Sequence, residues 1–486
     1  MYLGIDIGTS SVKSLLLDEN GVLIASKSED LPISRPHPMW SEQDPADWWK
    51  AVDKTVRRLG SEINLGDIKA IGLSGQMHGA TLLDRQQRIL RPAILWNDGR
   101  SHLQCQTLER LVPNARHITG NIMMPGFTAP KLLWVRENEQ TIFRDIDKVL
   151  LPKDYIRLML TGEFATDMSD AAGTMWMDVA ARNWNDELLD ACGLSRVHMP
   201  TLYEGNQITG LLRKQVALAW GMSCVPVVAG GGDNAAGAVG VGIYRAGQAM
   251  LSLGTSGVYF TVTDGFRSNP DRAVHSFCHA LPKTWHLMSV MLSAASCLDW
   301  LGKLTKVADV TVLLDEAEHD VQEGTLPWFL PYLSGERTPY NDPYAKGVFF
   351  GLTHQHGRAE LVRAVLEGVG FGLLDGIDAV SECGTEVKQT TLIGGGARSV
   401  FWRQMLADIS GRVLEYRRGG ESGPALGAAR LAQIALNPSL DIAIQLPPPP
   451  LEQVHHPDRA RHAQYTERRA TFKELYRQLH GLMRSP

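Results

Sequence analysis

The chain has 486 residues, of which 44% are hydrophobic and 21% are charged, and its formal net charge at pH 7 is −5. This length exceeds the roughly 250–300 residues of one hydrophobic core, so we expect at least two domains. The composition is typical of a soluble globular protein: it offers no basic face for nucleic acid, and no apolar run approaches the roughly 18 residues of a membrane span.

The amino-terminal segment predicts a β-hairpin whose turn can hold a phosphate. Apolar runs lie before and after Gly8-Thr9-Ser10, which is typical of a strand, a tight turn and a second strand. The small turn residues let backbone N–H groups and hydroxyl groups point at one anion. By strand alternation Asp6 shares a face with Gly4 and Gly8, so we expect its carboxylate to face the turn.

Two polar loops follow in the first half. Asp44 is expected to cap a helix that begins at Pro45. An apolar run at 68–74 then predicts a strand that ends at the loop 75–79, and a second loop lies at 96–100. Because loops at strand ends collect ligand groups in open α/β sheets, both loops are candidate binding loops.

A glycine turn closes the first half. The apolar run 225–229 leads into Gly230-Gly231-Gly232-Asp233, which predicts a buried strand, a glycine turn and the start of a helix. A boundary is expected at residues 244–248. The predicted domains are therefore 1–245 and 246–486.

The second half repeats both motifs in the same order. An apolar run leads into Gly254-Thr255-Ser256, and 391–393 leads into Gly394-Gly395-Gly396-Ala397. Aligned on their glycines, Asp6 falls opposite Ser252 and Asp233 falls opposite Ala397. Each motif alone is weak evidence, but four in the same order twice predict a duplicated α/β fold that keeps its carboxylates in the first half.

The remaining features predict no metal or redox site. The six cysteines are scattered, as in reduced cytosolic proteins, and His275, His279 and His286 lack a convincing ligand spacing. With no leader-like amino terminus, we expect a cytoplasmic protein. After the spacer 447–450, Phe472, Leu475, Tyr476, Leu479 and Leu482 follow helical spacing and predict an amphipathic helix docked on the second domain.

The motifs resemble those of the FGGY carbohydrate kinases, within the actin-like ATPase superfamily. The segments that carry the resemblance are 41–45, 76–79, 96–100, 126–138, 232–237, 334–339 and 347–352 with Glu360, Leu361, Ala364 and Glu367. The resemblance spans Tyr2 to about residue 435. It implies an α/β fold of two actin-like (ribonuclease H-like) domains, with a nucleotide held in the interdomain cleft.

The resemblance also implies an activity and its partners. We expect a kinase that uses ATP with Mg²⁺ to phosphorylate the terminal hydroxyl group of a five-carbon ketose, with no nucleic-acid or membrane partner; a homodimer is compatible with the family. The residues expected to hold ATP are Gly8, Thr9, Ser10, Gly254, Thr255, Ser256, Gly394, Gly395, Gly396 and Ala397, with Arg398 nearby.

Two carboxylates are the candidate catalytic residues. Asp233 is the candidate base that orients and deprotonates the acceptor hydroxyl; the alternative is a helix N-cap. An ordinary pKa near 3.9 would make it act more by placement than by basicity. Asp6 is the candidate magnesium ligand, acting through water, and the alternative is a buried Asp that satisfies the N–H groups of its hairpin.

Sugar recognition is assigned to the two polar loops, since fixed polar groups discriminate strongly between hydroxyl patterns. The candidates are Met77, His78, Trp96, Asn97, Asp98 and Arg100, with Asp233. Trp96 stacks on the sugar or belongs to the core, and Asp98 with Arg100 binds sugar or forms an ion pair. The rival activities are another sugar or polyol kinase, such as a glycerol kinase or a gluconokinase, and a nucleotide-driven switch resembling actin.

Overall fold

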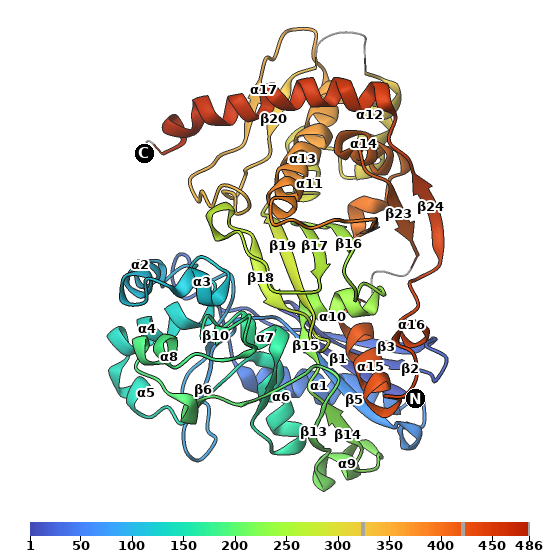
Figure 1. The fold of residues 1–486 in the computed structure, drawn as a ribbon. Coiled ribbons are helices and arrows are strands. Elements are labelled where there is room, and N and C mark those ends of the chain that lie inside the picture. The colour runs from blue at the N-terminus through green and yellow to red at the C-terminus, as the bar shows by residue number, and fades with distance from the viewer. Residues whose placement is uncertain (322–325, 419–422, 485–486) are drawn as a thin grey trace.

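A computed structural model describes residues 1–321, 326–418 and 423–484. Two bodies, each built on a central sheet, lie one above the other, and the chain runs from the lower body in blue and green to the upper one in yellow and red (Figure 1). Within the described residues, no helix combines the length and apolar character needed to cross a bilayer.

The first sheet runs in the order β13-β14-β5-β1-β2-β3, with the short β15 also paired to β5. Its strands are β1 (Tyr2–Ile7), β2 (Ser11–Leu17), β3 (Leu23–Asp30), β5 (Ala70–Gly75), β13 (Ile208–Leu211), β14 (Pro226–Val228) and β15 (Gly231–Gly232). The second sheet runs in the order β18-β19-β17-β16-β22-β23-β24. Its strands are β16 (Gln248–Leu253), β17 (Gly257–Thr263), β18 (His275–Cys278), β19 (Trp285–Met291), β22 (Gln389–Ile393), β23 (Leu414–Arg417) and β24 (Leu451–His455).

The two sheets confirm the predicted duplication. From β3 to β13 the neighbours are antiparallel, antiparallel, parallel, parallel and antiparallel, and the path from β19 to β24 has the same sequence of directions. The hairpins β1-β2 and β16-β17 therefore occupy equivalent places. Both predicted hairpins are confirmed, and so is the two-body α/β fold.

The predicted pairing of the glycine turns is wrong. In the common strand order, β22 corresponds to β5, whereas β14 corresponds to β23. The turn after β22, Gly394–Ala397, is therefore the counterpart of the loop 75–79, not of the turn that carries Asp233. The glycine triplets resemble each other locally, but long-range strand pairing places them at different positions.

Helices cover both sheets. In the first half they are α1 (Pro45–Gly60), α2 (His102–Leu111), α3 (Ala115–Thr119), α4 (Thr128–Asn138), α5 (Gln140–Arg144), α6 (Pro152–Thr161), α7 (Met168–Ala172), α8 (Asp186–Ala191), α9 (Lys214–Trp220) and α10 (Asp233–Gly240). In the second half they are α11 (Ser296–Thr305), α12 (Val310–His319), α13 (Arg358–Ser381), α14 (Val400–Ser410), α15 (Gly423–Leu436), α16 (Ile442–Gln445) and α17 (Arg459–Met483). Asp44 caps α1 and Pro45 is its first residue, as predicted.

Short two-stranded sheets complete the fold around this frame. They pair β4 (Glu42–Gln43) with β7 (Ala93–Ile94), β6 (Thr81–Leu83) with β8 (Lys148–Leu150), β9 (Ala165–Asp167) with β12 (Thr201–Tyr203), β10 (Met177–Asp178) with β11 (Asn183–Trp184), and β20 (Trp328–Leu330) with β21 (Val348–Phe350). The first four of these pairs belong to the first half of the chain.

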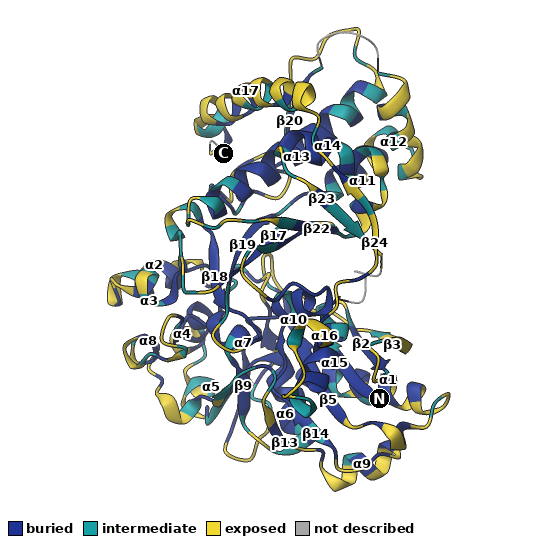
Figure 2. Ribbon diagram, turned by 45° about the vertical axis from the view of Figure 1, so that its right-hand side comes forward, coloured by how far each residue is buried: buried dark blue, intermediate teal, exposed yellow. Residues whose placement is uncertain are grey.

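The carboxy-terminal helix α17 packs on the second body, as predicted. It buries Phe472, Leu475 and Tyr476, and the Tyr476 hydroxyl donates to Asp342 Oδ2 at 2.9 Å. The prediction is wrong for Leu482, which is 69% exposed: the buried face of the helix continues through Leu479 to Met483, and Leu482 lies beside it. Figure 2 shows this helix with an exposed outer face, in contrast to the mostly buried strands of both sheets.

Helix α15 crosses from the second half of the chain to the first sheet. It packs against β1, β5 and α10, and these elements share one buried core (Figure 1). Glycine permits the close approach: a Cβ atom on Gly72 would lie 1.8 Å from the Ala428 carbonyl oxygen, and one on Gly427 would lie 1.7 Å from the Ala236 carbonyl oxygen. The domain boundary at 245/246 stays a prediction. A single boundary does not account for α15, because this helix belongs to the second half of the chain but packs on the sheet of the first half.

Candidate functional site

A cleft of about 570 Å³ lies where the two halves face each other. The first half contributes loop residues and the start of α10, and the second half contributes its hairpin and the strands beside it. The polar residues that line the cleft are His78, Trp96, Asp233, Asn234, Ser252, Thr255, Ser256, His275 and Arg337. The cleft therefore brings together residues from both predicted sugar loops, the candidate base and the second phosphate hairpin.

Asp233 is the first residue of α10, and its carboxyl group is only partly exposed. The N-cap is Gly232, and no side chain caps this helix, so the N-cap alternative for Asp233 is wrong. The Asn234 backbone N–H and its side-chain amide both donate to Asp233 Oδ1, at 2.7 and 2.9 Å. Burial raises the pKa of Asp233 to about 6, which corrects the expected value near 3.9 and makes this carboxylate a better base near neutral pH.

Asp6 lies at the end of β1, on the face that carries Gly4 and packs against α15. Its Oδ1 atom is buried without a hydrogen-bond partner among the described residues, whereas the hairpin N–H of Gly8 donates to the Ser11 carbonyl oxygen at 3.0 Å. Burial, and next the charge of Asp233, raise the pKa of Asp6 to about 7. The charge of Asp233, which lines the cleft, thus reaches the buried Asp6, although Asp6 itself is not one of the lining residues.

His78 presents a neutral imidazole to the cleft. Its backbone lies in the left-handed region, with φ of 69°, and its carbonyl oxygen accepts from Lys131 Nζ at 2.9 Å. Burial and the charges of Lys131 and Arg337 lower the pKa of His78 to about 3. Nδ1 lies 2.8 Å from the Gly173 carbonyl oxygen, which can only accept, so Nδ1 carries the proton and Nε2 is an acceptor. The adjacent Met77 is buried and also lines the cleft.

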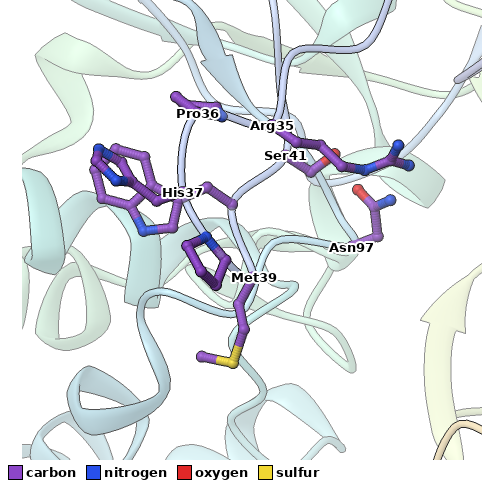
Figure 3. Close-up of a pocket in the computed structure, with 8 residues that line it drawn as sticks. Arg35, Pro36, His37, Met39, Ser41 and Asn97 are labelled. Atoms are coloured by element: carbon purple, nitrogen blue, oxygen red, sulfur yellow. The ribbon is translucent and has the colours of Figure 1, made fainter.

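The side chains of the loop 96–100 lie in three different places. Trp96 lines the cleft and is 38% exposed, so it does not belong to the core. Asn97 instead borders a separate surface pocket of about 460 Å³, beside Arg35 and Ser41 (Figure 3).

Asp98 and Arg100 form a buried ion pair. Of the two alternatives for these residues, a direct sugar contact and an ion pair, the structure shows the second. Arg100 Nη2 lies 2.7 Å from Asp98 Oδ2, and Arg100 Nη1 lies 2.8 Å from Glu42. The same Asp98 oxygen accepts the backbone N–H of Ser41 at 2.6 Å. The guanidinium group stacks over Trp40, with 3.5 Å to the ring centroid. These contacts hold the loop, and with it Trp96, against the segment before α1.

Thr9 ties the first phosphate hairpin to the sugar loops. The indole N–H of Trp96 donates to Thr9 Oγ1 at 2.9 Å, and Thr9 Oγ1 donates to Gln76 Oε1 at 3.0 Å. Gln76 in turn donates to Gln43 Oε1 at 2.9 Å. Because the one hydroxyl proton of Thr9 is already donated, its side chain serves as a link between loops.

Replacing Thr9 with valine is expected to lower the free energy of unfolding by about 1–2 kcal/mol, because the buried Gln76 oxygen loses its donor. Thr9→Ser keeps the hydroxyl group and should be close to the wild type. Thr255→Val is the matched control in the second hairpin, since the described residues give its hydroxyl group no hydrogen bond. Urea unfolding followed by tryptophan fluorescence measures all three, and equal midpoints for Thr9→Val and Thr255→Val would contradict the link.

The second half contributes its hairpin and its glycine loop to this region. The side chains of Ser252, Thr255 and Ser256 line the cleft. In the glycine loop, Gly394 has φ of 99° and Gly396 packs on Leu253, which are structural roles. A Cβ atom on Gly395 would meet nothing within 4 Å, so the space beside this residue is open. Ala397 is buried.

A buried polar cluster next to the glycine turn that carries Asp233 was not predicted. Lys153 Nζ lies 2.6 Å from Asp154, 2.9 Å from Asp167 and 3.0 Å from Asp170, and all four side chains are inaccessible to solvent. Asp167 accepts the Ser169 hydroxyl, and Ser169 Oγ accepts the N–H of Gly232 at 3.0 Å. The cluster therefore holds the residue before Asp233. No local signal marks it, because its members come from α6, β9 and α7.

The described residues contain no group of three His, Cys, Asp or Glu side chains placed to hold a metal ion. Among the described carboxylates with a buried oxygen that lacks a hydrogen-bond partner, Asp6 is the one whose pKa responds to the charge of Asp233, and it is the candidate for holding a cation. This arrangement fits a cation that keeps most of its water and binds through one carboxylate and the phosphates of a nucleotide, as Mg²⁺ does.

The fold and cleft define a two-domain kinase that transfers a phosphoryl group to an alcohol. The chain belongs to the FGGY family of carbohydrate kinases: the family's N-terminal domain model matches residues 1–240 and its C-terminal domain model matches residues 249–436. The predicted family is thereby confirmed, together with its actin-like fold.

Similar proteins cover the whole chain. The xylulose kinase of Escherichia coli (strain K12) is 66% identical over 99% of this chain and 100% of its own length, and that of Klebsiella pneumoniae is 61% identical over the same shares. Among solved structures, one described as a xyloylose kinase of Brucella ovis has a TM-score of 0.95 and 47% identity, and covers 99% of both chains.

Proposed function

We propose that the enzyme transfers the γ-phosphoryl group of ATP to the C5 hydroxyl group of D-xylulose, giving D-xylulose 5-phosphate and ADP. The observation that carries the proposal is the shared cleft, in which Asp233 of the first half faces the hairpin residues Ser252, Thr255 and Ser256 of the second. The names of the relatives that match the whole chain supply the sugar.

Asp233 acts as the general base in this proposal. Asn234 fixes Oδ1, so the carboxylate is oriented before substrate arrives. It accepts the proton of the C5 hydroxyl group as that oxygen bonds to the γ-phosphorus atom and the bond from phosphorus to the β,γ-bridging oxygen breaks, which leaves ADP. Its raised pKa of about 6 suits this exchange near neutral pH.

The other candidate residues position the two substrates. Asp6 would hold Mg²⁺ through water, and the cation supplies charge neutralisation to the phosphates. His78 Nε2 accepts a sugar hydroxyl beside Met77 and Trp96. The turns 8–10 and 254–256 bind phosphates, and Gly395 faces the adenine ring. A cytoplasmic location is supported by six cysteines that form no disulfide; the homodimer stays a prediction.

A coupled ADP-release assay over D-xylulose, related ketoses, aldoses, gluconate and glycerol tests the function. We expect the highest kcat/KM with D-xylulose. A higher kcat/KM with gluconate or glycerol would show that the enzyme is another sugar or polyol kinase. ATP turnover that does not change with any sugar would rule out the proposed sugar site.

The rate should depend on the ionisation of Asp233. A base works only when deprotonated, so a pKa of about 6 predicts that kcat is flat above neutrality and falls as the pH decreases through 6. The expected slope at lower pH is about tenfold per pH unit. The measurement uses saturating MgATP and D-xylulose, with direct detection of the sugar phosphate so that no coupling enzyme limits the rate. A kcat that stays constant down to about pH 5 would exclude a base with this pKa.

A further inference from the structure

Arg337 lines the cleft from the second half, within the segment 334–339 that the sequence marks without a role. The backbone on both sides of it is fixed to the end of β19. Thr338 exchanges two hydrogen bonds of 3.1 Å with Val290, and Glu336 accepts the Leu292 N–H at 3.0 Å. The guanidinium group is therefore presented to the cleft from a rigid support.

The guanidinium group has no protein partner in the described part of the chain: the one hydrogen bond that Arg337 donates comes from its backbone N–H, to Glu336. The neighbouring Glu336 uses its carboxyl group to accept backbone N–H groups of Leu292 and Arg337 and forms no ion pair with the guanidinium group in the described residues. Burial lowers the pKa of Arg337. A partly buried cation without a partner is costly, so its place in a substrate cleft points to a ligand oxygen.

The surroundings of Arg337 indicate which ligand it meets. The hydroxyl group of the next residue, Thr338, donates to the Ala273 carbonyl oxygen at 2.9 Å, two residues before His275. The rings of His275 and His78 both pack on Phe127, and the charge of Arg337 lowers the pKa values of both histidines. Arg337 therefore enters the cleft on the side of His275 and the proposed sugar loop.

The chemistry of the proposed substrate supplies an acceptor on that side. A 2-ketose of five carbons closes a five-membered ring only through its C5 hydroxyl group. A molecule whose C5 hydroxyl receives a phosphoryl group must therefore be open-chain, with a free carbonyl oxygen at C2. This oxygen lies at the end of the sugar remote from the transferred group, and it can only accept hydrogen bonds.

We propose that Arg337 is a substrate-binding residue that donates to the C2 carbonyl oxygen and so holds the remote end of the open-chain ketose. The proposal rests on the proposed function. It gives the second half of the chain a part in sugar recognition, so the sugar is bound from both sides of the cleft.

Arg337→Ala tests the proposal. Loss of a charge-assisted hydrogen bond predicts a KM for D-xylulose about 10- to 100-fold higher, with a KM for ATP within about threefold of the wild type. Millimolar guanidinium chloride should lower the KM for D-xylulose again, and sodium chloride at the same ionic strength should not. Arg337→Lys should lie between the two, and Arg85→Ala, which removes an exposed charge in a turn far from the cleft, should match the wild type.

Glycerol provides the second measurement, because it offers a terminal hydroxyl group without a carbonyl end. Its kcat/KM, or its inhibition constant against D-xylulose, is expected to change less than about threefold in Arg337→Ala. An equal loss with glycerol, a raised KM for ATP, or an unchanged KM for D-xylulose would each overturn the proposal. A wild-type enzyme inactive on D-xylulose would instead overturn the proposed function.

Discussion

Asp233→Asn is expected to lower kcat by about a thousandfold, because general-base catalysis typically contributes about 10²- to 10⁴-fold. Asparagine has nearly the same shape and keeps an oxygen that can accept from Asn234, so the loop should stay in place. The KM for ATP should change little, since Asp233 lies at the acceptor side of the transfer. Single-turnover measurement of sugar phosphate with MgATP gives the chemical step directly.

Two comparisons make this result specific to the base. Asp264→Asn changes the same chemical group at an exposed position and should keep the wild-type rate. The residual activity of Asp233→Asn should also lose the decline below pH 6, because the group responsible for it is gone. A kcat within about tenfold of the wild type would assign the proton to another acceptor.

Lys153→Met is expected to lower the free energy of unfolding by about 3–5 kcal/mol, because it leaves buried carboxylates without their cation. Three carboxyl groups lie within 3.0 Å of Lys153 Nζ. Burial raises the pKa of Asp170, and Lys153 with the neighbouring Arg157 supplies the positive charge of the cluster. Methionine fills a similar volume without the charge, so the loss reports electrostatics rather than a cavity.

The same cluster also supports the glycine turn that carries Asp233, so kcat provides a second measurement of its effect. Arg157 donates to the Val228 and Ala229 carbonyl oxygens, and Ser169 holds the Gly232 N–H, so both sides of the glycine turn depend on it. We expect Lys153→Met to lower the urea midpoint and also kcat. Lys69→Met is the control, because Lys69 pairs with Glu19 at the surface and should leave both unchanged. An unaltered midpoint for Lys153→Met would show that the cluster does not stabilise the fold.

Local sequence patterns predicted the individual elements of the fold better than they predicted which element of one half corresponds to which element of the other. The two hairpins could be predicted because Gly-Thr-Ser turns between apolar runs are local signals. The glycine turns before α10 and α14 were wrongly paired, because the sequence does not reveal which strand lies beside β1. Once β5 and β22 are matched, the proposed sugar loop 75–79 and adenine loop 394–397 occupy the same position in their halves.

In the candidate site, too, local patterns could be predicted from the sequence and interactions between distant residues could not. Met77, His78 and Asp233 were predicted from loops at strand ends, and they line one cleft. The raised pKa of Asp233 was missed, because the residues that bury it come from distant parts of the chain. The ion pair of Asp98 and Arg100 could not be distinguished from a sugar contact, since its partners Ser41 and Glu42 are distant in sequence.

The crossing of α15 has a consequence for biosynthesis. During translation, β1 and β5 emerge early, but the helix that covers Gly4 and Gly72 belongs to residues 423–436. A nascent chain released after the first half would therefore display an apolar sheet face to chaperones, and that half can reach its native packing only when nearly the whole polypeptide has left the ribosome.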